Sequence, residues 1–413
     1  MQLTINIERL MARIFELGQV GALPGGGVCR LALTDEDKAG RDLVISWMLE
    51  LGMSIQTDYI GNVIALRKGR REGPCVMLGS HIDTVATGGL YDGNLGVLAG
   101  LEVVHVLNDA NMETEFPLAV AFFTNEEGAR FQPDMLGSSV YGGTLPLAEA
   151  LAAKDNKGIS LGDELKRIGY TGEVEPGFLI PRAYLELHVE QGPVLERKNM
   201  QIGCVTGVQG ISWQELTITG VSNHAGTTPM NMRQDAGYAA AAIMLGVRAI
   251  CDEMGAAQVG TCGYVELQPN LVNVIARKAM LTVDLRNIES EKMLESEQRL
   301  QVLVDRVAEQ EKVDISLRRL CRFEPILFDE RMVSLVTAKT REAGLTHMRM
   351  PSGAGHDAGL MANICPVGMV FVPSVGGISH NVKEYTSPED IEAGANVFLQ
   401  CTLDLLQDED VLV

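Results

Sequence analysis

Residues 74–85 read PCVMLGSHIDTV, a continuous apolar run that ends directly in a histidine and an aspartate. The same arrangement recurs in PLAVAFFTNEE at 117–127 and in AYLELHVEQ at 183–191. Apolar runs of this length are typical of strands buried in a mainly parallel sheet. Between the first two runs, GVLAGLEVVHVLNDA at 96–110 favours a helix. This alternation predicts the α/β class, with a mainly parallel sheet covered by helices on both faces.

Polar side chains follow each of these predicted strands. They are His81 and Asp83, then Glu126 and Glu127, then His188. Open α/β sheets present catalytic groups at the carboxyl ends of their strands, so we expect these residues to converge. Clustered histidines and carboxylates of this kind indicate a hydrolytic metal centre.

A second type of pattern occupies the middle of the chain. A chain of 413 residues exceeds the size at which a single core keeps growing, so two domains are expected. From about residue 211 the sequence predicts a β-α-β-β-α-β order typical of a ferredoxin-like unit, with strands at 211–220, 261–268, 276–286 and 313–320 and helices at 234–254 and 290–310. The α/β pattern returns after about residue 328. We therefore expect a catalytic domain of residues 1–210 and 328–413, with residues 211–327 inserted.

Composition limits the possible partners and compartment. The chain has 34 basic against 54 acidic residues and a net charge of −20, which disfavours nucleic acid and anionic membrane surfaces. The eight cysteines form no CxxC pair, as expected in a reducing cytoplasm. The N-terminal residues carry charges throughout, unlike a signal peptide. The longest apolar run, at 239–247, is far shorter than a membrane span.

The clustered residues match what a two-metal hydrolase requires. Asp92 lies in a glycine-flanked turn and suits a carboxylate that bridges two ions. Adjacent residues at a strand end point in different directions, so one of Glu126 and Glu127 can bind metal while the other moves a proton. The alternative for such a pair is a solvated charge pair, but its place after FFT and beside His81 favours function. Of the seven histidines, we expect His105 and His347 to be structural.

These motifs resemble those of the M20 metallopeptidase superfamily and, within it, the hydantoinase/carbamoylase amidases, which include N-carbamoyl-L-amino acid hydrolases, allantoate amidohydrolases and β-ureidopropionases. The resemblance covers nearly the full length, through GGGVCRLALT, GSHIDTV, YDGNLGVLAG, TNEEGARF, LELHVEQGPVLE, SNHAGTTPM, LVNVI, DLR, SGAGHDA and GISHN. Of these, HVEQGPVLE and NHAGTTPM separate the amidases from ordinary M20 peptidases.

The resemblance implies two divalent metal ions per subunit. The implied ligand sets share one carboxylate: His81, Asp92 and His188 for one ion, and Asp92, Glu127 and His380 for the other. Glu126 matches the general base, and Asp83 matches the carboxylate that orients His81. Mixed histidine and carboxylate ligands admit zinc, manganese, cobalt or nickel.

The resemblance also assigns the inserted domain to a lid and homodimerisation role. It implies that His224 stabilises the oxyanion and that Arg286 pairs with the substrate carboxylate, although a surface strand residue is the alternative for Arg286. The further positions matched to substrate binding are Gln191, Asn273, Gly353, Gly355 and His356. Family members often carry proline where this chain has Ala276 and Val382, which bears on loop geometry rather than on chemistry.

The implied activity is hydrolysis of the ureido group of N-carbamoyl-L-amino acids, small substrates that also carry a carboxylate. The long N-terminal segment GQVGALPGGGVCRLALTDED, the GVLAGLEVV helix and ICPVGMVFV favour this reading. The alternatives are allantoate amidohydrolase or β-ureidopropionase, then an M20 dipeptidase or aminoacylase, then a metal-binding homologue without activity.

Overall fold

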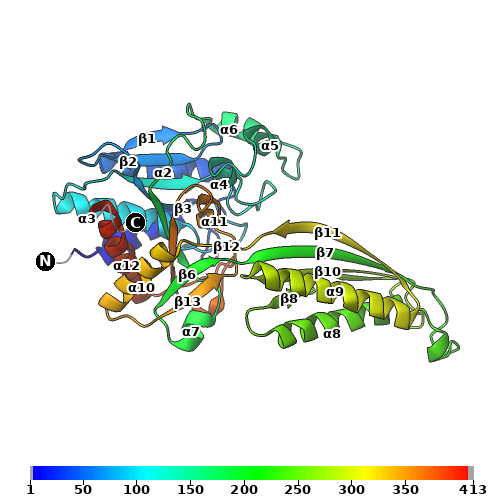
Figure 1. The fold of residues 1–413 in the computed structure, drawn as a ribbon. Coiled ribbons are helices and arrows are strands. Elements are labelled where there is room, and N and C mark those ends of the chain that lie inside the picture. The colour runs from blue at the N-terminus through cyan, green and yellow to red at the C-terminus, as the bar shows by residue number, and fades with distance from the viewer. Residues whose placement is uncertain (1–2, 408–413) are drawn as a thin grey trace. The chain divides into compact units, whose positions relative to one another are not determined.

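The computed structural model describes residues 3–407, and the chain divides into two compact units. Unit 1 combines the chain up to Thr206 with the chain from Phe328 onward, and unit 2 is Gly207–Leu327. In Figure 1, unit 1 carries the blue, cyan, orange and red segments together with the green α7, and unit 2 carries the green to yellow segments from β7 to β11. None of the described helices is long and apolar enough to cross a membrane.

Unit 1 contains most of a nine-stranded sheet, all but β12 and the end of β6. Its order is β1-β2-β4-β3-β5-β14-β6-β12, with β13 beside β6. The strands are β1 Ser54–Thr57, β2 Val63–Arg67, β3 Val76–His81, β4 Leu118–Phe123, β5 Ala183–Val189, β6 Ile202–Val208, β12 Ile326–Leu327, β13 His347–Ser352 and β14 Val367–Val372. The four central strands β4, β3, β5 and β14 run parallel, whereas β1, β2, β6 and β12 pair antiparallel. The predicted α/β class is confirmed, and the central strands β4, β3, β5 and β14 pair in parallel.

The central strands explain the apolar runs of the sequence. Every residue of β3, β4, β5 and β14 is buried, so both faces of these strands are covered. Two groups of helices contact them, α3 (Asn94–Asp109) with α12 (Pro388–Gln407) and α4 (Leu136–Tyr141) with α11 (Asp357–Met361), and α10 (Glu330–Glu342) contacts β14. The remaining helices of unit 1 are α1 Ile7–Gly18, α2 Asp35–Glu50, α5 Leu147–Ala152, α6 Leu161–Ile168, α7 Val194–Lys198 and the short η2 Val375–Gly377.

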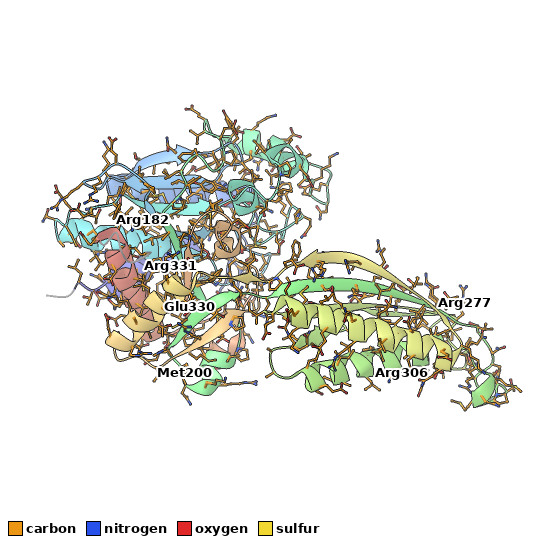
Figure 2. All side chains as sticks on the ribbon, in the orientation of Figure 1. Arg182, Met200, Arg277, Arg306, Glu330 and Arg331 are labelled. Carbon is orange, nitrogen blue, oxygen red and sulfur yellow. The ribbon has the colours of Figure 1, made fainter. Side chains whose placement is uncertain are left out.

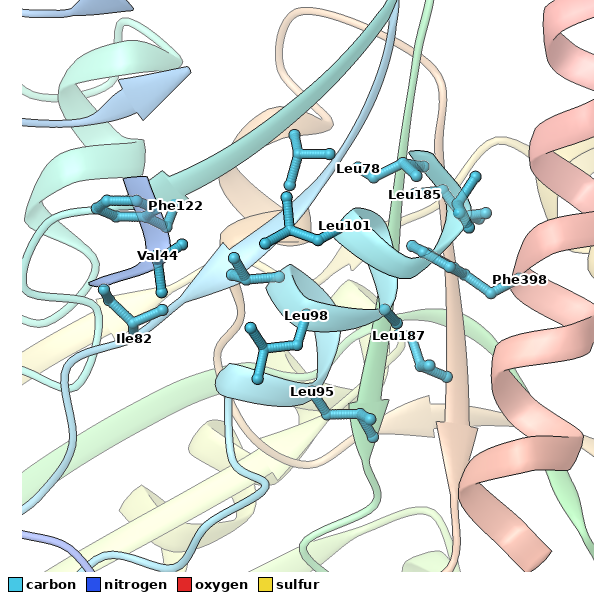
Figure 3. Close-up of a cluster of buried hydrophobic side chains, with 14 of the residues drawn as sticks. Val44, Leu78, Ile82, Leu95, Leu98, Leu101, Phe122, Leu185, Leu187 and Phe398 are labelled. Atoms are coloured by element: carbon cyan, nitrogen blue, oxygen red, sulfur yellow. The ribbon is translucent and has the colours of Figure 1, made fainter. Parts of the chain in front are cut away.

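Helix α3 is the core helix of unit 1. It is buried on almost every side, which fits its nearly continuous apolar sequence. Figure 3 shows its Leu95, Leu98 and Leu101 among side chains from the sheet and from α12, including Leu78, Leu185, Leu187 and Phe398. This packing anchors the turn that precedes α3 and carries Asp92.

Helix ends in unit 1 follow local sequence signals. The side chain of Asp329 accepts a hydrogen bond from the backbone N–H of Arg331 and caps α10, whose first turn carries Glu330 (Figure 2). In α2, Thr34 caps the helix by accepting from the N–H of Asp37. Such caps satisfy backbone donors that the first helical turn leaves unpaired.

Unit 2 is built on a five-stranded antiparallel sheet of order β11-β7-β10-β8, with β9 beside β10. Its elements are β7 Gly210–Thr219, η1 Met230–Met232, α8 Ala236–Met254, β8 Val259–Thr261, β9 Val265–Gln268, β10 Lys278–Asn287, α9 Ser290–Glu311 and β11 Asp314–Phe323. The order of helices and strands is the predicted one, except that the expected strand at 261–268 is divided into β8 and β9.

One face of this sheet builds a core of its own. Residues of β10 alternate between buried and half-buried, and Ala279, Leu281, Val283 and Leu285 point to the buried side. There they form one cluster with residues of α8 and α9 such as Ile243 and Leu300. The long charged sequence of α9 therefore covers the sheet with an apolar stripe.

Candidate metal centre

The predicted strand ends do bring the polar residues of unit 1 together. His81 is the last residue of β3, His188 lies near the end of β5, and Glu126 and Glu127 follow β4. Asp92 lies in the turn before α3, and His380 lies in the loop after β14. These residues come from parallel strands that end at the same edge of the sheet.

The carboxylate of Asp92 is at the centre of the cluster, and its two oxygens face different partners. Oδ1 lies 3.1 Å from Nε2 of His188 and 3.7 Å from Nε2 of His81. Oδ2 lies 3.2 Å from Nε2 of His380, which is also 3.2 Å from Oε2 of Glu127. Two groups able to hold a metal ion result, His81 with Asp92 and His188, and Asp92 with Glu127 and His380. These two groups thus share Asp92.

Backbone carbonyls fix the orientation of two imidazoles. Nδ1 of His81 lies 2.9 Å from the carbonyl oxygen of Asp83, and Nδ1 of His188 lies 2.8 Å from that of Val189. A carbonyl only accepts, so each Nδ1 carries a proton, and each Nε2 is the nitrogen that faces Asp92. Neutral imidazoles combined with carboxylates are a donor set that suits divalent transition metals, so the residues fit such ions.

Burial and crowding shift the pKa values across the cluster. Burial lowers the pKa of His81 to about 4. Burial, followed by the charges of Asp357 and Glu127, raises the pKa of Glu126 well above its ordinary value. Hydrogen bonds to Asp92 and Glu127 raise the pKa of His380 to about 10. Several carboxylates therefore share a buried site that needs positive charge nearby.

Asp83 is connected to the glutamate pair. Its carboxylate accepts the backbone N–H groups of Glu126 and Glu127 at 3.2 and 3.3 Å. Nδ1 of His81 is 3.9 Å from Oδ1 of Asp83, farther than from the Asp83 carbonyl oxygen. Burial raises the pKa of Asp83 to about 8. Asp83 thus orients His81 through its backbone and holds the glutamate turn through its side chain.

A cavity of about 100 Å³ opens on this cluster within unit 1. It is lined by Asp92, Glu126, Glu127, Asp134, His188, Gln191, Ala354, Gly355, His356 and His380. Of the predicted substrate positions, Gln191, Gly355 and His356 line it, whereas Gly353 is not part of its lining. Asp134 and Ala354 are additional; Ala354 lies in the quoted motif SGAGHDA, but no sequence signal indicated Asp134.

Gln191 and His356 have defined partners at the cavity wall. Nε2 of Gln191 donates to Oδ2 of Asp92 at 2.9 Å, and within the described residues its buried Oε1 has no hydrogen-bond partner. The His356 ring lies edge-on to the His188 ring, with centroids 4.5 Å apart, and its Nε2 is 2.9 Å from Oγ of Ser352. Gln191 therefore offers an acceptor to a bound molecule, and His356 supports His188.

Glu186 lies in a third group of possible ligands, with His188 and His356. Its carboxylate already accepts from Oγ of Ser80 at 2.7 Å, the hydroxyl of Tyr184 at 3.3 Å and the N–H of Ala358 at 2.9 Å. These donors satisfy Glu186, which therefore acts as a buried brace between β3, β5 and α11.

The other predicted residues lie in unit 2, where His224 and Asn273 are neighbours. The N–H of Ala225 donates to the carbonyl of Asn273, and His224 pairs with Val274. Nδ1 of His224 accepts from the N–H groups of Gly226 and Thr227, so Nε2 carries the proton. His224 is exposed and therefore presents a hydrogen-bond donor to its surroundings.

Arg286 is engaged by a neighbouring carboxylate. Its Nε lies 3.1 Å from both oxygens of Asp284, and its Nη2 lies 2.9 Å from Oδ2. The two residues are separated by one position on β10 and so project from the same face of the strand. His105 and His347 lie outside the metal-binding groups: His105 contacts Arg13, and His347 contacts the Leu345 carbonyl.

Comparison with known proteins places the chain in a family. It is 42% identical over 401 residues to an N-carbamoyl-L-amino-acid amidohydrolase of Rhizobium meliloti, covering 97% of this chain and 96% of that protein. It is 33% identical to a ureidoglycolate hydrolase of Arabidopsis thaliana, covering 96% of this chain and 86% of that protein. A crystal structure of an amidase of the hydantoinase/carbamoylase family from Burkholderia multivorans superimposes with a TM-score of 0.96 at 42% identity, covering 98% and 99% of the two chains. Because the sequence model of peptidase family M20/M25/M40 also matches residues 77–404, the chain belongs to that family.

Proposed function

We propose that this protein is an amidohydrolase that cleaves the ureido C–N bond of N-carbamoyl-L-amino acids and yields the amino acid, ammonia and carbon dioxide. One observation carries the proposal: Oδ1 of Asp92 lies near His188, Oδ2 of Asp92 lies near His380, and Glu126 lies next to His81. The amidohydrolase relative and the amidase structure, similar over nearly the whole chain, support this substrate class.

The proposed centre holds two divalent ions. One would be held by His81, Asp92 and His188, and the other by Asp92, Glu127 and His380. When bound, such ions supply Lewis-acid polarisation of the ureido carbonyl and acidify water. The donor set suits zinc, manganese, cobalt or nickel.

Glu126 is the proposed general base. Its Oε2 lies 3.3 Å from Nε2 of His81, at the wall of the cavity, and burial raises its pKa. A carboxylate with a raised pKa accepts a proton from water as the water oxygen bonds to the ureido carbon, and it returns that proton to the leaving nitrogen when the C–N bond breaks. Asp83 keeps Glu126 in place by accepting its backbone N–H.

The remaining residues are proposed to bind the substrate. The unpaired Oε1 of Gln191 suits an N–H of the ureido group, and the protonated Nε2 of His224 suits the oxyanion that forms at its carbonyl. Arg286 would pair with the substrate carboxylate, which requires that it exchange Asp284 for the substrate. Asn273, Gly353, Gly355 and His356 complete the proposed substrate contacts.

Three proposals concern the whole protein. Unit 1 would act as the catalytic domain and unit 2 as a lid. A homodimer would form through unit 2. A cytoplasmic location is supported by the eight cysteines, all of which are free thiols.

The Glu126→Gln variant tests the mechanism. The amide cannot accept the proton, so we expect turnover of an N-carbamoyl-L-amino acid to fall by about 10²–10⁴-fold. Ammonia release measures turnover, and elemental analysis measures bound metal, which should stay unchanged. Near-normal turnover with unchanged metal content would contradict the assignment.

A substrate panel separates this function from its alternatives. The similarity to a ureidoglycolate hydrolase supports a second ureido substrate class. Protein stripped of metal and reloaded with single metals would be given N-carbamoyl-L-amino acids, N-carbamoyl-β-alanine, allantoate, ureidoglycolate and a dipeptide, while release of ammonia and amine is followed. Strong turnover of allantoate or ureidoglycolate alone would rule out the leading choice.

A further inference from the structure

Glu384 connects the two loops that carry Asp92 and His380. It follows His380 in the loop before α12 and is 6% exposed. Its Oε1 accepts the backbone N–H groups of Tyr91 and Asp92, both at 3.1 Å. Its Oε2 accepts the hydroxyl of Ser379 at 2.8 Å. One carboxylate therefore joins segments that lie almost 300 residues apart in the chain.

Ser379 extends this connection to the ligand atoms. Its Oγ is also 3.3 Å from Oδ2 of Asp92, the oxygen that faces His380. A hydroxyl has one proton, and the shorter contact to Glu384 is the stronger bond. Because Ser379 is adjacent to His380 in sequence, Glu384 restrains both the backbone of Asp92 and the residue beside His380.

Gly89 makes room for this carboxylate. A Cβ at position 89 would lie 2.2 Å from Oε1 of Glu384 and 2.5 Å from its Cβ. No side chain other than hydrogen fits there while Glu384 reaches the Asp92 turn. The turn is thus shaped around Glu384.

The two ligand groups depend on this connection to different extents. His81 and His188 lie on β3 and β5, where pairing with Phe123 of β4 and Phe371 of β14 fixes their backbones. His380 lies in a loop, and its side chain is 51% exposed. The ligand group of Asp92, Glu127 and His380 therefore relies on loop contacts for its geometry.

We propose that Glu384 is a positioning residue that holds the Asp92 turn against the His380 loop and so sets the metal affinity of the group formed by Asp92, Glu127 and His380. This inference rests on the proposed two-metal centre. Partners that orient metal ligands typically contribute 10–100-fold to metal affinity. Glu384 would act on the ions through Asp92 and His380, without touching substrate.

The test measures zinc binding to the full chain stripped of metal, by calorimetric titration and by competition with a chromophoric chelator. For the wild type we expect two ions per chain. We expect the group of Asp92, Glu127 and His380 to form the weaker zinc site and the group of His81, Asp92 and His188 the tighter one. For Glu384→Ala we expect the weaker site to lose about 10–100-fold in affinity, while the affinity of the tighter site changes by less than about threefold. The zinc affinity of the weaker site in Glu384→Gln should lie between those of the wild type and Glu384→Ala. The amide oxygen of the Glu384→Gln variant still accepts backbone N–H groups, but its amide nitrogen cannot accept from Ser379.

Asp155→Ala is the matched control. Asp155 is a buried carboxylate that also accepts two backbone N–H groups, those of Lys157 and Ile159, but it lies in the loop before α6. We expect Asp155→Ala to lower the melting temperature and to leave both zinc affinities unchanged. Turnover of Glu384→Ala should recover at saturating zinc, because the ligands and Glu126 are intact.

The outcomes separate this inference from the proposed function. One zinc ion per wild-type chain would overturn the two-metal centre and this inference with it. Two ions in the wild type with equal changes at both sites of Glu384→Ala, or no change, would overturn the role of Glu384 alone. If Glu384→Ala does not fold, Glu384→Gln decides: an unchanged weaker site in that variant overturns the inference.

Discussion

Arg30 is a single buried residue whose hydrogen bonds join several segments near the site. Its side chain is fully buried, and its guanidinium donates to the carbonyls of Leu17, Val20 and Ile82 and to the side-chain oxygen of Asn94. Burial lowers its pKa to about 10. Arg30 thereby joins α1, the end of β3 and the start of α3 around the loop that carries Asp92.

Removing this guanidinium should therefore be costly. We expect Arg30→Ala to lower the free energy of unfolding by about 3 kcal/mol or more, because several buried carbonyls lose their donors. Chemical denaturation measures the change. Arg248→Ala is the control, since Arg248 is 79% exposed and forms an exposed ion pair with Asp252, so its loss should cost less than about 1 kcal/mol. Equal losses in both variants would contradict the role of Arg30.

Asp58 should make stability depend on pH. It is buried between β1 and β2, and burial raises its pKa to about 7 from an ordinary 3.8. The folded state thus favours the protonated form, a contribution that is complete below pH 3.8 and is lost as pH rises through 7. We expect the unfolding free energy of the wild type, relative to Asp58→Asn, to fall by roughly 2 kcal/mol between pH 5 and 7. A constant difference in denaturation experiments would contradict this.

At the scale of elements, α3 couples the core to the site. Its apolar residues fill the space between β3, β5 and α12, and its first turn follows directly on Asp92 (Figure 3). The sequence predicted this helix as a periodic segment between two strand-like apolar runs. Its burial on nearly all sides accounts for the small number of polar residues in it.

Leu101→Ala tests the contribution of α3. Leu101 is fully buried, so truncation should lower the free energy of unfolding by about 2–5 kcal/mol through lost burial and a cavity. Leu49→Ala on α2 is the matched control, because Leu49 is 57% exposed, and it should cost less than about 1 kcal/mol. Thermal and denaturant unfolding measure both. A Leu101→Ala cost as small as that of the control would show that α3 packs loosely.

At the scale of the whole molecule, the two units have separate cores. The buried residues of unit 2 form their own cluster, and the candidate ligands all lie in unit 1. Metal binding should therefore stabilise unit 1 selectively. A ligand at 100 times its dissociation constant contributes about 2.7 kcal/mol to the state that binds it.

Calorimetry can test this selectivity. We expect zinc to raise the melting temperature of one transition and a chelator to lower it, while a second transition stays in place. Asp92→Ala removes the shared ligand and should abolish the shift. A zinc-dependent shift that persists in Asp92→Ala would place the stabilising ions elsewhere.

Local patterns predicted much of this architecture. The apolar runs that became β3, β4 and β5, and the predicted strands at 211–220 and 276–286 that became β7 and β10, are signals carried by neighbouring residues. The division of one predicted strand into β8 and β9 was not anticipated, because that strand lies at the sheet edge and is mostly exposed, so little burial pattern marks it. The edge strands β1 and β12 are likewise very short, with four and two residues.

The candidate site shows the same division between local and distant information. Histidines and carboxylates at strand ends could be recognised in the sequence because each follows its strand directly. Contacts between distant segments decide which oxygen of Asp92 faces which histidine, and they bring Glu384 to Tyr91. The pairing of Arg286 with Asp284 depends on the directions of two side chains on the same strand. The amino-acid sequence by itself thus determined the class of fold, the family and the residue types of the site, since these follow from the motifs and their spacing. Tertiary packing alone decided how those residues meet, because hydrogen bonds and burial act through space between groups that the chain keeps hundreds of residues apart.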